Sequence, residues 1–277
     1  MPIRRPGLAH LCAVLMMLGA GSSAWAVPLA VTNPGFEDLY LAGNLPAQYM
    51  GDVPGGAFPT GGPPTGWDAF TPAGAPGLVG VLNPAQPPVA TCFPAGAPEG
   101  DNVLLLYQSG GAGGNPYGVR QILVDELQPN TRYTLTVEVG NIASCAGLVS
   151  PYTGFFDLEG FPGYQVQLLA GGSLLEEDDN TLFAELLPAE GEFRTSQIVY
   201  ESGDTVTPGQ ALEIRLISLN QATAAPGQDG VEVDFDQIVL EATPLLAVPS
   251  VHPAWLTAVL GVAGVAAQRR RSLRGRR

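Results

Sequence analysis

Four carboxylates near the two ends of the central region are the first candidates for chemistry. Asp234 and Asp236 lie in the segment V-E-V-D-F-D-Q-I-V-L-E-A, and Glu37 and Asp38 lie in the segment V-T-N-P-G-F-E-D-L-Y. Calcium in proteins takes about six to eight oxygen ligands, many of them from carboxylates. We therefore predict a structural calcium site formed by Glu37, Asp38, Asp234 and Asp236. The alternative is that these acids are only the solvated face of edge strands.

The two segments that carry these acids must lie side by side for such a site to form. In Val231–Ala242 apolar and acidic residues alternate, which is typical of a β-strand with one buried face. Asp234 and Asp236 share a face because strand side chains repeat every second residue. We therefore predict that Val31–Tyr40 and Val231–Ala242 are neighbours and that their pairing closes a β-sandwich.

Aromatic side chains are the second set of candidates, because exposed rings can stack on sugars or hold an apolar ligand. Trp67, Tyr152, Phe155 and Phe156 are predicted to contact a ligand. The last three lie in Ile142–Pro162, whose irregular sequence predicts a loop. For any one of these aromatics, burial in the core is the commoner alternative.

Histidine is confined to the terminal segments, at His10 and His252. Ser-His-Asp catalysis, Cys-His catalysis and histidine-bound zinc are therefore excluded for the central region. Cys92 and Cys145 are the two cysteines that follow the N-terminal segment. In an exported domain, such a pair favours a disulfide over a metal site or a nucleophile.

The central region is strongly acidic. All 26 acidic residues lie in it, whereas eight of the 12 basic residues lie in the terminal segments. The four remaining arginines leave the region with a net charge of −22. Such a surface repels phosphate backbones, so nucleic acid is excluded as a partner, and solubility accounts for most of these charges.

The N-terminal segment predicts export. Met1–Ala26 begins with two arginines, continues with an apolar run and ends in A-W-A, which is typical of a cleaved signal peptide. The alternative, a retained membrane helix, is disfavoured because the apolar run is shorter than the roughly 20 residues that span a bilayer.

The C-terminal tail, residues 244–277, predicts membrane anchoring. Ala254–Ala267 is apolar and is followed by six arginines, which hold their end of a span on the cytoplasmic side. The tail resembles the PEP-CTERM class of bacterial sorting signals, with Val248-Pro249-Ser250 where that class has Val-Pro-Glu-Pro. The resemblance implies an exosortase-type partner and a place in the cell envelope or outside the cell. The alternative is a simple membrane anchor.

Residues 27–243 are predicted to form one all-β domain. Thr131–Gly140 alternates most clearly, Val103–Tyr107 is apolar throughout, and Tyr164–Ala170 and Ser173–Glu176 flank a Gly-Gly turn. About ten such segments, separated by Gly- and Pro-rich turns, predict a two-sheet antiparallel jelly-roll sandwich. The terminal segments would add an N-terminal signal helix and a C-terminal apolar anchor helix.

Five motifs in this domain carry a family resemblance. They are N-P-G-F-E at Asn33–Glu37, T-R-Y-T-L-T-V-E-V-G-N at Thr131–Asn141, G-Y-Q-V-Q-L-L-A-G-G at Gly163–Gly172, E-I-R-L-I-S at Glu213–Ser218 and V-D-F-D-Q-I-V-L at Val233–Leu240. Together they resemble the hapalindole-type (Stig) cyclases and, more distantly, calcium-containing carbohydrate-binding modules.

The resemblance implies a calcium-bearing jelly roll in which Glu37 and Asp236 match calcium positions. In those cyclases an aspartate acts as an acid on an isonitrile-bearing indole terpenoid in an aromatic-lined cavity. Asp234 is the candidate for that acid in this sequence.

Three functions remain open from the sequence. The leading hypothesis is an exported, envelope-associated β-sandwich that binds a glycan or other extracellular polymer without catalysis, because such sorting tails often accompany exopolysaccharide. The alternative is a cyclase-like enzyme with an aspartate acid in an aromatic-lined cavity. The third is a passive matrix component. An enclosed aromatic pocket with a buried carboxyl favours the enzyme, and a shallow groove with exposed rings favours glycan binding.

Overall fold

The computed structural model describes residues 25–38, 63–72, 77–84, 92–109, 115–149, 152–180, 187–221 and 229–245, with the backbone alone at 109, 146–149 and 152–154. Every regular element in these ranges is a β-strand, so the predicted all-β fold is confirmed. Within them, no helix is long and apolar enough to cross a membrane. The predicted signal and anchor helices lie outside the described residues, as does the separate unit Leu246–Arg277.

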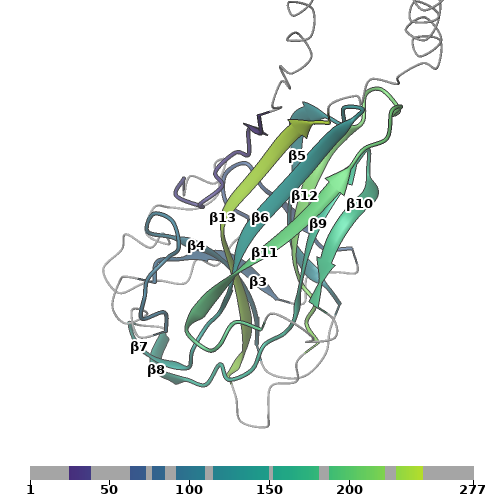
Figure 1. Ribbon diagram of the computed structural model, residues 1–277. Coiled ribbons are helices and arrows are strands. Elements are labelled where there is room, and N and C mark those ends of the chain that lie inside the picture. Colours follow the sequence, from purple (N-terminus) through teal and green to yellow (C-terminus); the bar gives the residue numbers. More distant parts are fainter. Residues whose placement is uncertain are drawn as a thin grey trace, which may run out of the picture. The chain divides into compact units, whose positions relative to one another are not determined.

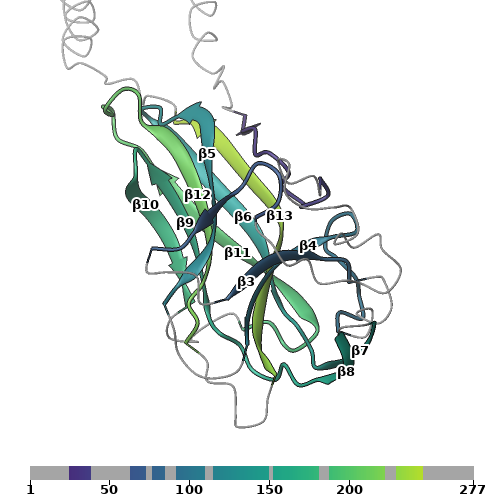
Figure 2. The ribbon, with the colours of Figure 1, turned by 180° about the vertical axis from the view of Figure 1, so that it is seen from behind.

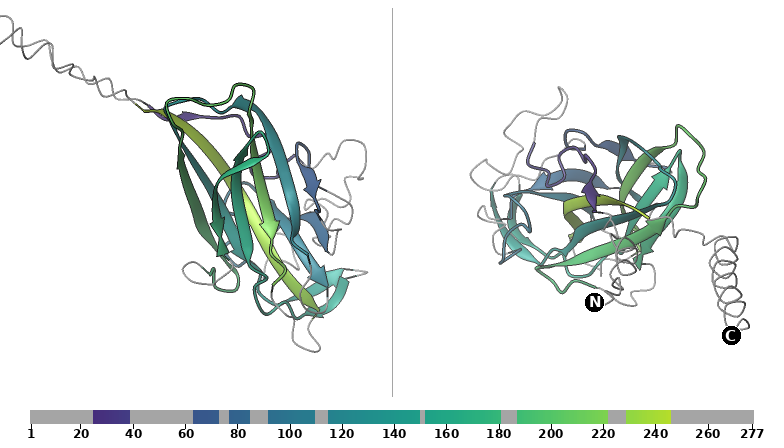
Figure 3. Two further views of the ribbon diagram at one scale, coloured as in Figure 1. Left: turned by 90° about the vertical axis from the view of Figure 1, so that its right-hand side faces the viewer. Right: turned by 45° about the horizontal axis from the view of Figure 1, so that its top comes forward.

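In the described ranges, thirteen strands form two packed antiparallel sheets and a small hairpin. They are β1 Val27–Pro28, β2 Asp68–Phe70, β3 Leu78–Leu82, β4 Val103–Ser109, β5 Tyr117–Glu126, β6 Thr131–Asn141, β7 Cys145–Val149, β8 Tyr152–Phe156, β9 Tyr164–Ala170, β10 Ser173–Asp179, β11 Glu192–Glu201, β12 Ala211–Ser218 and β13 Gly230–Pro244. Sheet A has the order β11-β6-β13-β4-β3 with β1 beside β13, and sheet B has the order β10-β9-β12-β5-β2. The two sheets lie face to face (Figure 1, Figure 3).

Alternating side chains build the core between the sheets. On β6 of sheet A, Tyr133, Leu135, Val137 and Val139 are buried in this core, as the alternation of Thr131–Gly140 predicts. From the opposite side, sheet B contributes the alternating residues Leu212, Ile214 and Leu216 of β12. The inner faces of the sandwich therefore pack as the period-2 pattern requires.

Strand β13 lies in the middle of sheet A. It pairs with β6 on one side, and on the other it pairs with β4 over its first half and with β1 near its end. Val27 lies opposite Ala242, and the Leu29 amide donates to the Leu240 carbonyl at 2.8 Å. The start of the domain therefore pairs with β13 from Val27, earlier than the predicted Val31–Tyr40. Within the predicted segment, the Pro34 carbonyl accepts a hydrogen bond from the Ile238 amide at 3.0 Å.

A second buried layer covers the outer face of sheet A. On β4, Leu104 and Leu106 point into the sandwich, whereas Val103 and Leu105 point outward and are equally buried. The outward side chains belong to a group that we call the outer cluster, made of Leu82, Cys92, Phe93, Val103, Leu105, Ile142, Cys145 and Leu158. This cover explains why Val103–Tyr107, the first five residues of β4, are apolar throughout.

The 92–98 segment and the β7–β8 hairpin cover the outer face of sheet A, and a disulfide joins them. The structure links Cys92, at the start of the 92–98 segment, to Cys145 on β7 by a disulfide. Strands β7 and β8 pair as a hairpin, which Figure 2 shows at the lower end of the sandwich beyond β3 and β4. The prediction of a loop over Ile142–Pro162 is therefore wrong for this part, because two five-residue strands are too short to show a clear period.

The carboxylate of Asp178 links the two sheets at one edge of the sandwich. On β10, Asp178 Oδ2 accepts hydrogen bonds from the Tyr164 hydroxyl at 2.7 Å and from the Ser196 hydroxyl on β11 at 2.6 Å. β10 is the outermost strand of sheet B and β11 is the outermost strand of sheet A. One side chain therefore bonds the two sheets together at this edge.

Replacing this carboxylate is expected to destabilise the fold. Asp178→Ala should lower the free energy of unfolding by about 2–3 kcal/mol, because two hydroxyls lose a charged acceptor and the Tyr164 hydroxyl is left buried and unpaired. Urea denaturation of Asp178→Ala, Tyr164→Phe and the double variant should show a coupling above about 0.5 kcal/mol. The exposed Asp204→Ala is the control and should change stability by less than about 0.5 kcal/mol. Strictly additive losses would contradict the role of Asp178.

Candidate active site

Asp234 lies in the middle of the outer face of sheet A. Its cross-strand neighbours are Gly140 on β6 and Leu105 on β4, and Phe193 on β11 lies opposite Gly140. Directly opposed residues of antiparallel strands share a face. Asp234 therefore lies in one transverse row with Leu105 and Phe193, under the outer cluster.

A glycine and two aromatic rings shape the surroundings of this acid. A Cβ atom at Gly140 would lie 2.5 Å from the Phe193 ring, so the missing side chain leaves the space that the ring occupies beside Asp234. The Phe193 ring packs in turn on Phe93 of the outer cluster, with 4.7 Å between ring centroids. The surroundings of Asp234 are therefore apolar and aromatic.

Asp234 is fully buried, at 0% exposure, beside a second buried acid. Glu232 precedes it by two residues on the same face and is 1% exposed. No amide in the described part of the chain donates a hydrogen bond to either oxygen of Asp234, and Glu232 is the neighbour with which its carboxyl interacts. Burial raises the pKa of Asp234 well above its ordinary value, and the Glu232 carboxylate raises it further. Burial raises the pKa of Glu232 as well.

A buried carboxyl with a raised pKa holds its proton to a higher pH than an ordinary carboxyl does and can give it to a bound molecule. Titratable groups of this kind, in apolar surroundings, are typical of functional sites rather than of structural ones. Asp234 therefore has the burial and the raised pKa that a general acid requires. Glu232 was missed as a site residue, although the alternation V-E-V-D-F-D already places it on the same face as Asp234.

Two of the predicted calcium ligands, Glu37 in the segment that follows β1 and Asp236 on β13, bind the same segment of backbone. Glu37 Oε1 accepts hydrogen bonds from the backbone amides of Asp101 and Asn102 at 2.7 and 2.8 Å. Asp236 Oδ2 accepts one from the Glu99 amide at 2.9 Å. The structure therefore brings Glu37 and Asp236 to one place, around residues 99–102.

A third carboxylate, that of Glu99, lies close to Asp236 in this region around residues 99–102. Glu99 Oε2 would lie 1.8 Å from a Cβ atom at Gly35, and Asp236 Oδ1 would lie 3.6 Å from the same point. Burial raises the pKa of Asp236 to about 8, and the negative charges of Glu99 and Glu37 add to that rise. We call Glu37, Glu99, Asp236 and Asn102 the edge site.

The other two predicted calcium ligands do not join the edge site. Asp38 is exposed, and its backbone closes a turn with the Asn33 side chain. Asp234 interacts with Glu232 instead. Across the described ranges, no three acidic, histidine or cysteine side chains stand in an arrangement that could already hold a metal ion.

The aromatic residues predicted to bind a ligand have different surroundings. Trp67 is only 4% exposed, packs on Phe36 in the core between the sheets, and donates from Nε1 to the Asn33 carbonyl at 3.3 Å. The prediction that Trp67 is a ligand platform is therefore wrong, because its ring fills the sandwich. On β8, Phe155 is 68% exposed and Phe156 packs against the outer cluster. The side chain of Tyr152 lies outside the described part of the chain.

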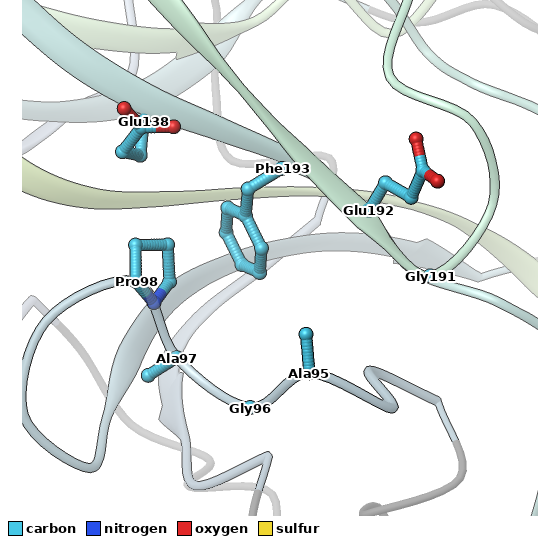
Figure 4. A pocket seen from close by; sticks show the side chains of 8 residues that line it. All are labelled: Ala95, Gly96, Ala97, Pro98, Glu138, Gly191, Glu192 and Phe193. Carbon is cyan, nitrogen blue, oxygen red and sulfur yellow. The ribbon is translucent and has the colours of Figure 1, made fainter.

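A pocket opens between the 92–98 segment and the start of β11 (Figure 4). Its volume is about 400 Å³, and its lining residues are Ala95, Gly96, Ala97, Pro98, Glu138, Gly191, Glu192 and Phe193. Two of them, Glu138 and Phe193, stand on the outer face of sheet A, where they are the cross-strand neighbours of Asp236 and Gly140. The pocket therefore adjoins the row that contains Asp234. The sequence did not indicate it.

Comparison with known proteins assigns the family. The family model described as HpiC1 cyclase matches residues 27–241. A cyclase from Fischerella sp. in its apo form has 30% sequence identity and a TM-score of 0.60, covering 80% of this chain and 98% of its own. The Stig cyclase Fisc from Fischerella sp. TAU, in complex with (3Z)-3-(1-methyl-2-pyrrolidinylidene)-3H-indole, has 31% identity and a TM-score of 0.60, covering 80% and 100%.

A cyclase from Fischerella sp. TAU in complex with 4-(1H-indol-3-yl)butan-2-one gives 31% identity, a TM-score of 0.59 and the same coverage of 80% and 100%. Among curated protein sequences, none matches this chain.

These matches overturn the leading hypothesis from the sequence. The prediction of a non-catalytic glycan binder, with its emphasis on carbohydrate recognition, is wrong, because the family model and the related structures are those of cyclases. The resemblance to the Stig cyclases is confirmed. The match of the family model to nearly all of the described domain, together with the identity to the Fischerella cyclases, shows that this chain belongs to the HpiC1-like cyclase family.

Proposed function

We propose that this protein is an acid-dependent cyclase that acts on an indole-bearing substrate, with Asp234 as the proton donor. The observation that carries the proposal is the fully buried carboxyl of Asp234, held in apolar surroundings in a member of a cyclase family. Two related cyclases are described in complexes with indole compounds, which supports the substrate class. The isonitrile group expected from the resemblance would be a further feature of that substrate.

The chemistry needs no group beyond a proton donor and a shaped cavity. Asp234 gives its proton to the substrate, and the carbon that becomes electron-deficient is attacked by a π bond, so that a carbon–carbon bond closes the ring. Loss of a proton from the cyclised product then restores a neutral molecule, and the Asp234 carboxylate takes up a proton again. The sum is an isomerisation, in which atoms and electrons balance.

The surroundings of Asp234 suit such a reaction. Water would capture an electron-deficient carbon, and the outer cluster excludes water from this part of sheet A. The aromatic rings of Phe93 and Phe193 present π faces, which stabilise positive charge. Because Asp234 is buried at 0% exposure, part of the cover must shift when the substrate binds.

A turnover assay tests the proposal. The purified protein is incubated with an isonitrile-bearing indole terpenoid, and the products are separated by liquid chromatography with mass detection. We expect a new product of unchanged mass, formed in proportion to the amount of protein. Conversion no faster than with heat-denatured protein would count against a cyclase function.

We infer that calcium stabilises the protein at the edge site. Carboxylate and amide oxygens are the donors that calcium prefers, and Asn102 Oδ1 is buried there without a hydrogen-bond partner in the described part of the chain. In the same described part, the arginine ion pairs join Arg132 to Glu201, Arg194 to Glu192 and Arg215 to Glu213, so none neutralises the edge site. A bound cation would offset this negative charge and tie residues 99–102 to β13.

When a chelator removes calcium, the free energy of unfolding is expected to depend on pH through the titration of Asp236. In the folded protein the pKa of Asp236 is about 8, whereas its ordinary value is 3.8, so the folded state binds the proton more tightly than the unfolded state does. Without calcium, the contribution of Asp236 to stability should therefore be greatest below about pH 4 and fall as pH rises toward 8, by up to roughly 5 kcal/mol.

Added calcium should reverse this loss, since a cation beside Asp236 favours the ionised form; at a free concentration 100-fold above Kd the gain is about 2.7 kcal/mol. Thermal melts with EDTA or calcium at pH 5 and pH 8 measure both effects. Asp236→Asn is the matched variant and should respond to neither pH nor calcium in this way. A melting temperature that EDTA leaves unchanged at pH 8 argues against the edge site.

Export and envelope location remain proposals from the terminal segments. The disulfide between Cys92 and Cys145 supports them, because such bonds persist in oxidising compartments. The sorting tail, its exosortase-type partner and the membrane anchor depend on residues outside the described ranges.

A further inference from the structure

The pocket beside Phe193 has walls that suit a flat aromatic body better than a sugar. Ala95, Ala97, Pro98 and the Phe193 ring supply apolar surface. Gly96 adds open space, since a Cβ atom there would meet nothing within 4 Å. A volume of about 400 Å³ lies in the range typical of sites for small organic ligands.

One carboxylate of the pocket is placed to accept a hydrogen bond from such a ligand. Glu138 Oε1 already accepts one from the Thr195 hydroxyl at 2.5 Å, which fixes the orientation of the carboxylate. No other described residue is bonded to Glu138, so its second oxygen can take a donor from the pocket. Figure 4 shows Glu138 on the Pro98 side of the pocket, with the Phe193 ring pointing toward the Ala95–Pro98 segment.

The second carboxylate of the pocket is different. Glu192 lies 3.7 Å from the Arg194 guanidinium, and both side chains are about half exposed. In Figure 4 its carboxylate lies on the far side of Phe193 from Glu138. The two acids line the same pocket, but only Glu138 combines a fixed orientation with a place beside the apolar walls.

We propose that this pocket is a binding subsite for an aromatic ring bearing an N–H donor, with Phe193 and Pro98 holding the ring and Glu138 accepting the N–H. The inference rests on the proposed function, because it assigns the recognition of the substrate's nitrogen ring to these residues. Glu138 lies opposite Asp236, two residues along β13 from Asp234, or about 7 Å at the rise of a strand. A ligand anchored at Glu138 thus has its other end within reach of the Asp234 acid.

Binding measurements with two probes test this subsite without relying on turnover. The probes are 4-(1H-indol-3-yl)butan-2-one and its N-methyl derivative, which lacks the N–H donor. Their affinities are measured by calorimetry for the unaltered protein, Glu138→Leu, Glu138→Gln and Glu192→Leu. Asp234→Asn is included as a variant that should bind both probes normally while losing turnover.

We expect N-methylation to weaken binding to the unaltered protein by roughly tenfold or more, which corresponds to one hydrogen bond to a charged group. The penalty should vanish in Glu138→Leu, be reduced in Glu138→Gln and persist in Glu192→Leu. Thermal melts verify that each variant is folded.

The subsite is overturned if N-methylation costs the same in Glu138→Leu as in the unaltered protein, or if neither probe binds. If the penalty follows Glu138 but no cyclised product forms in the turnover assay, the subsite stands and the proposed cyclase function fails.

Discussion

Asp234→Asn is expected to reduce the rate of cyclisation by about 10²–10⁴-fold, the usual contribution of a positioned general acid. The amide is close to the carboxyl in size, so the packing of Asp234 under the outer cluster should be kept. An amide has no acidic proton to give. The loss should therefore appear in kcat, measured by product formation under saturating substrate, with substrate binding nearly unchanged.

The pH profile provides a second measurement of the same acid. The pKa of Asp234 is raised, so the active, protonated form should persist to a higher pH than for an ordinary aspartic acid and disappear as pH rises through that raised value. Glu232→Gln removes one of the charges that raise it. The descending limb of kcat should therefore move to lower pH in Glu232→Gln, whereas a purely structural role for Glu232 would lower activity without moving the limb.

Asp236→Asn is the matched control for both experiments. It lies two residues from Asp234 on the same strand, and its carboxylate accepts a hydrogen bond from the Glu99 amide. Its effect should fall on stability rather than on kcat. If Asp236→Asn and Asp234→Asn reduce kcat equally, Asp234 has no special part in the reaction.

Loss of the Cys92–Cys145 disulfide should have the largest effect on stability. The bond spans 53 residues, and closing a loop of that length in the unfolded chain corresponds to about 4 kcal/mol in the chain-entropy model. For a domain of this size, that is a drop in Tm of about 8–16 °C. Differential scanning calorimetry of Cys92→Ala/Cys145→Ala measures it.

The Cys92→Ala/Cys145→Ala variant should also loosen one wall of the pocket, because the 92–98 segment forms that wall. Both cysteines are buried at 4% exposure or less, so alanine keeps the site apolar and leaves only small cavities. The matched control is the unaltered protein with and without a reductant in urea, where unfolding makes the disulfide accessible to the reductant. Equal stability of the double variant and the disulfide-bonded protein would contradict a clamp at this position.

Alternation along the strands allowed much of this fold to be predicted from the sequence. The period of two places Asp234 and Asp236 on one face and the β6 core residues on the other side of the sheet, because successive strand side chains point in opposite directions. The adjacency of the first and last segments and the all-β class also followed from these patterns. The family resemblance lay in the same strand motifs.

Other features depended on tertiary structure. A strand pattern shows which residues share a face but not what covers that face, so the apolar sequence of β4 did not reveal the second layer on sheet A. Trp67 was expected at a ligand and lies in the core, because the direction of a side chain in an irregular segment depends on distant neighbours. Glu138 became a pocket residue only because β6 pairs with β13 and β11 and the 92–98 segment folds over them.

The sequence by itself therefore determined the class of the fold and the faces of its strands, since both follow from local spacing, whereas Asp234 was a candidate acid through the family resemblance. Tertiary structure alone decided that Asp234 is sealed from water. Burial, and with it the raised pKa, arises from segments such as 92–98 that are more than 100 residues away along the chain. A local sequence pattern does not show which distant segments will cover a given residue.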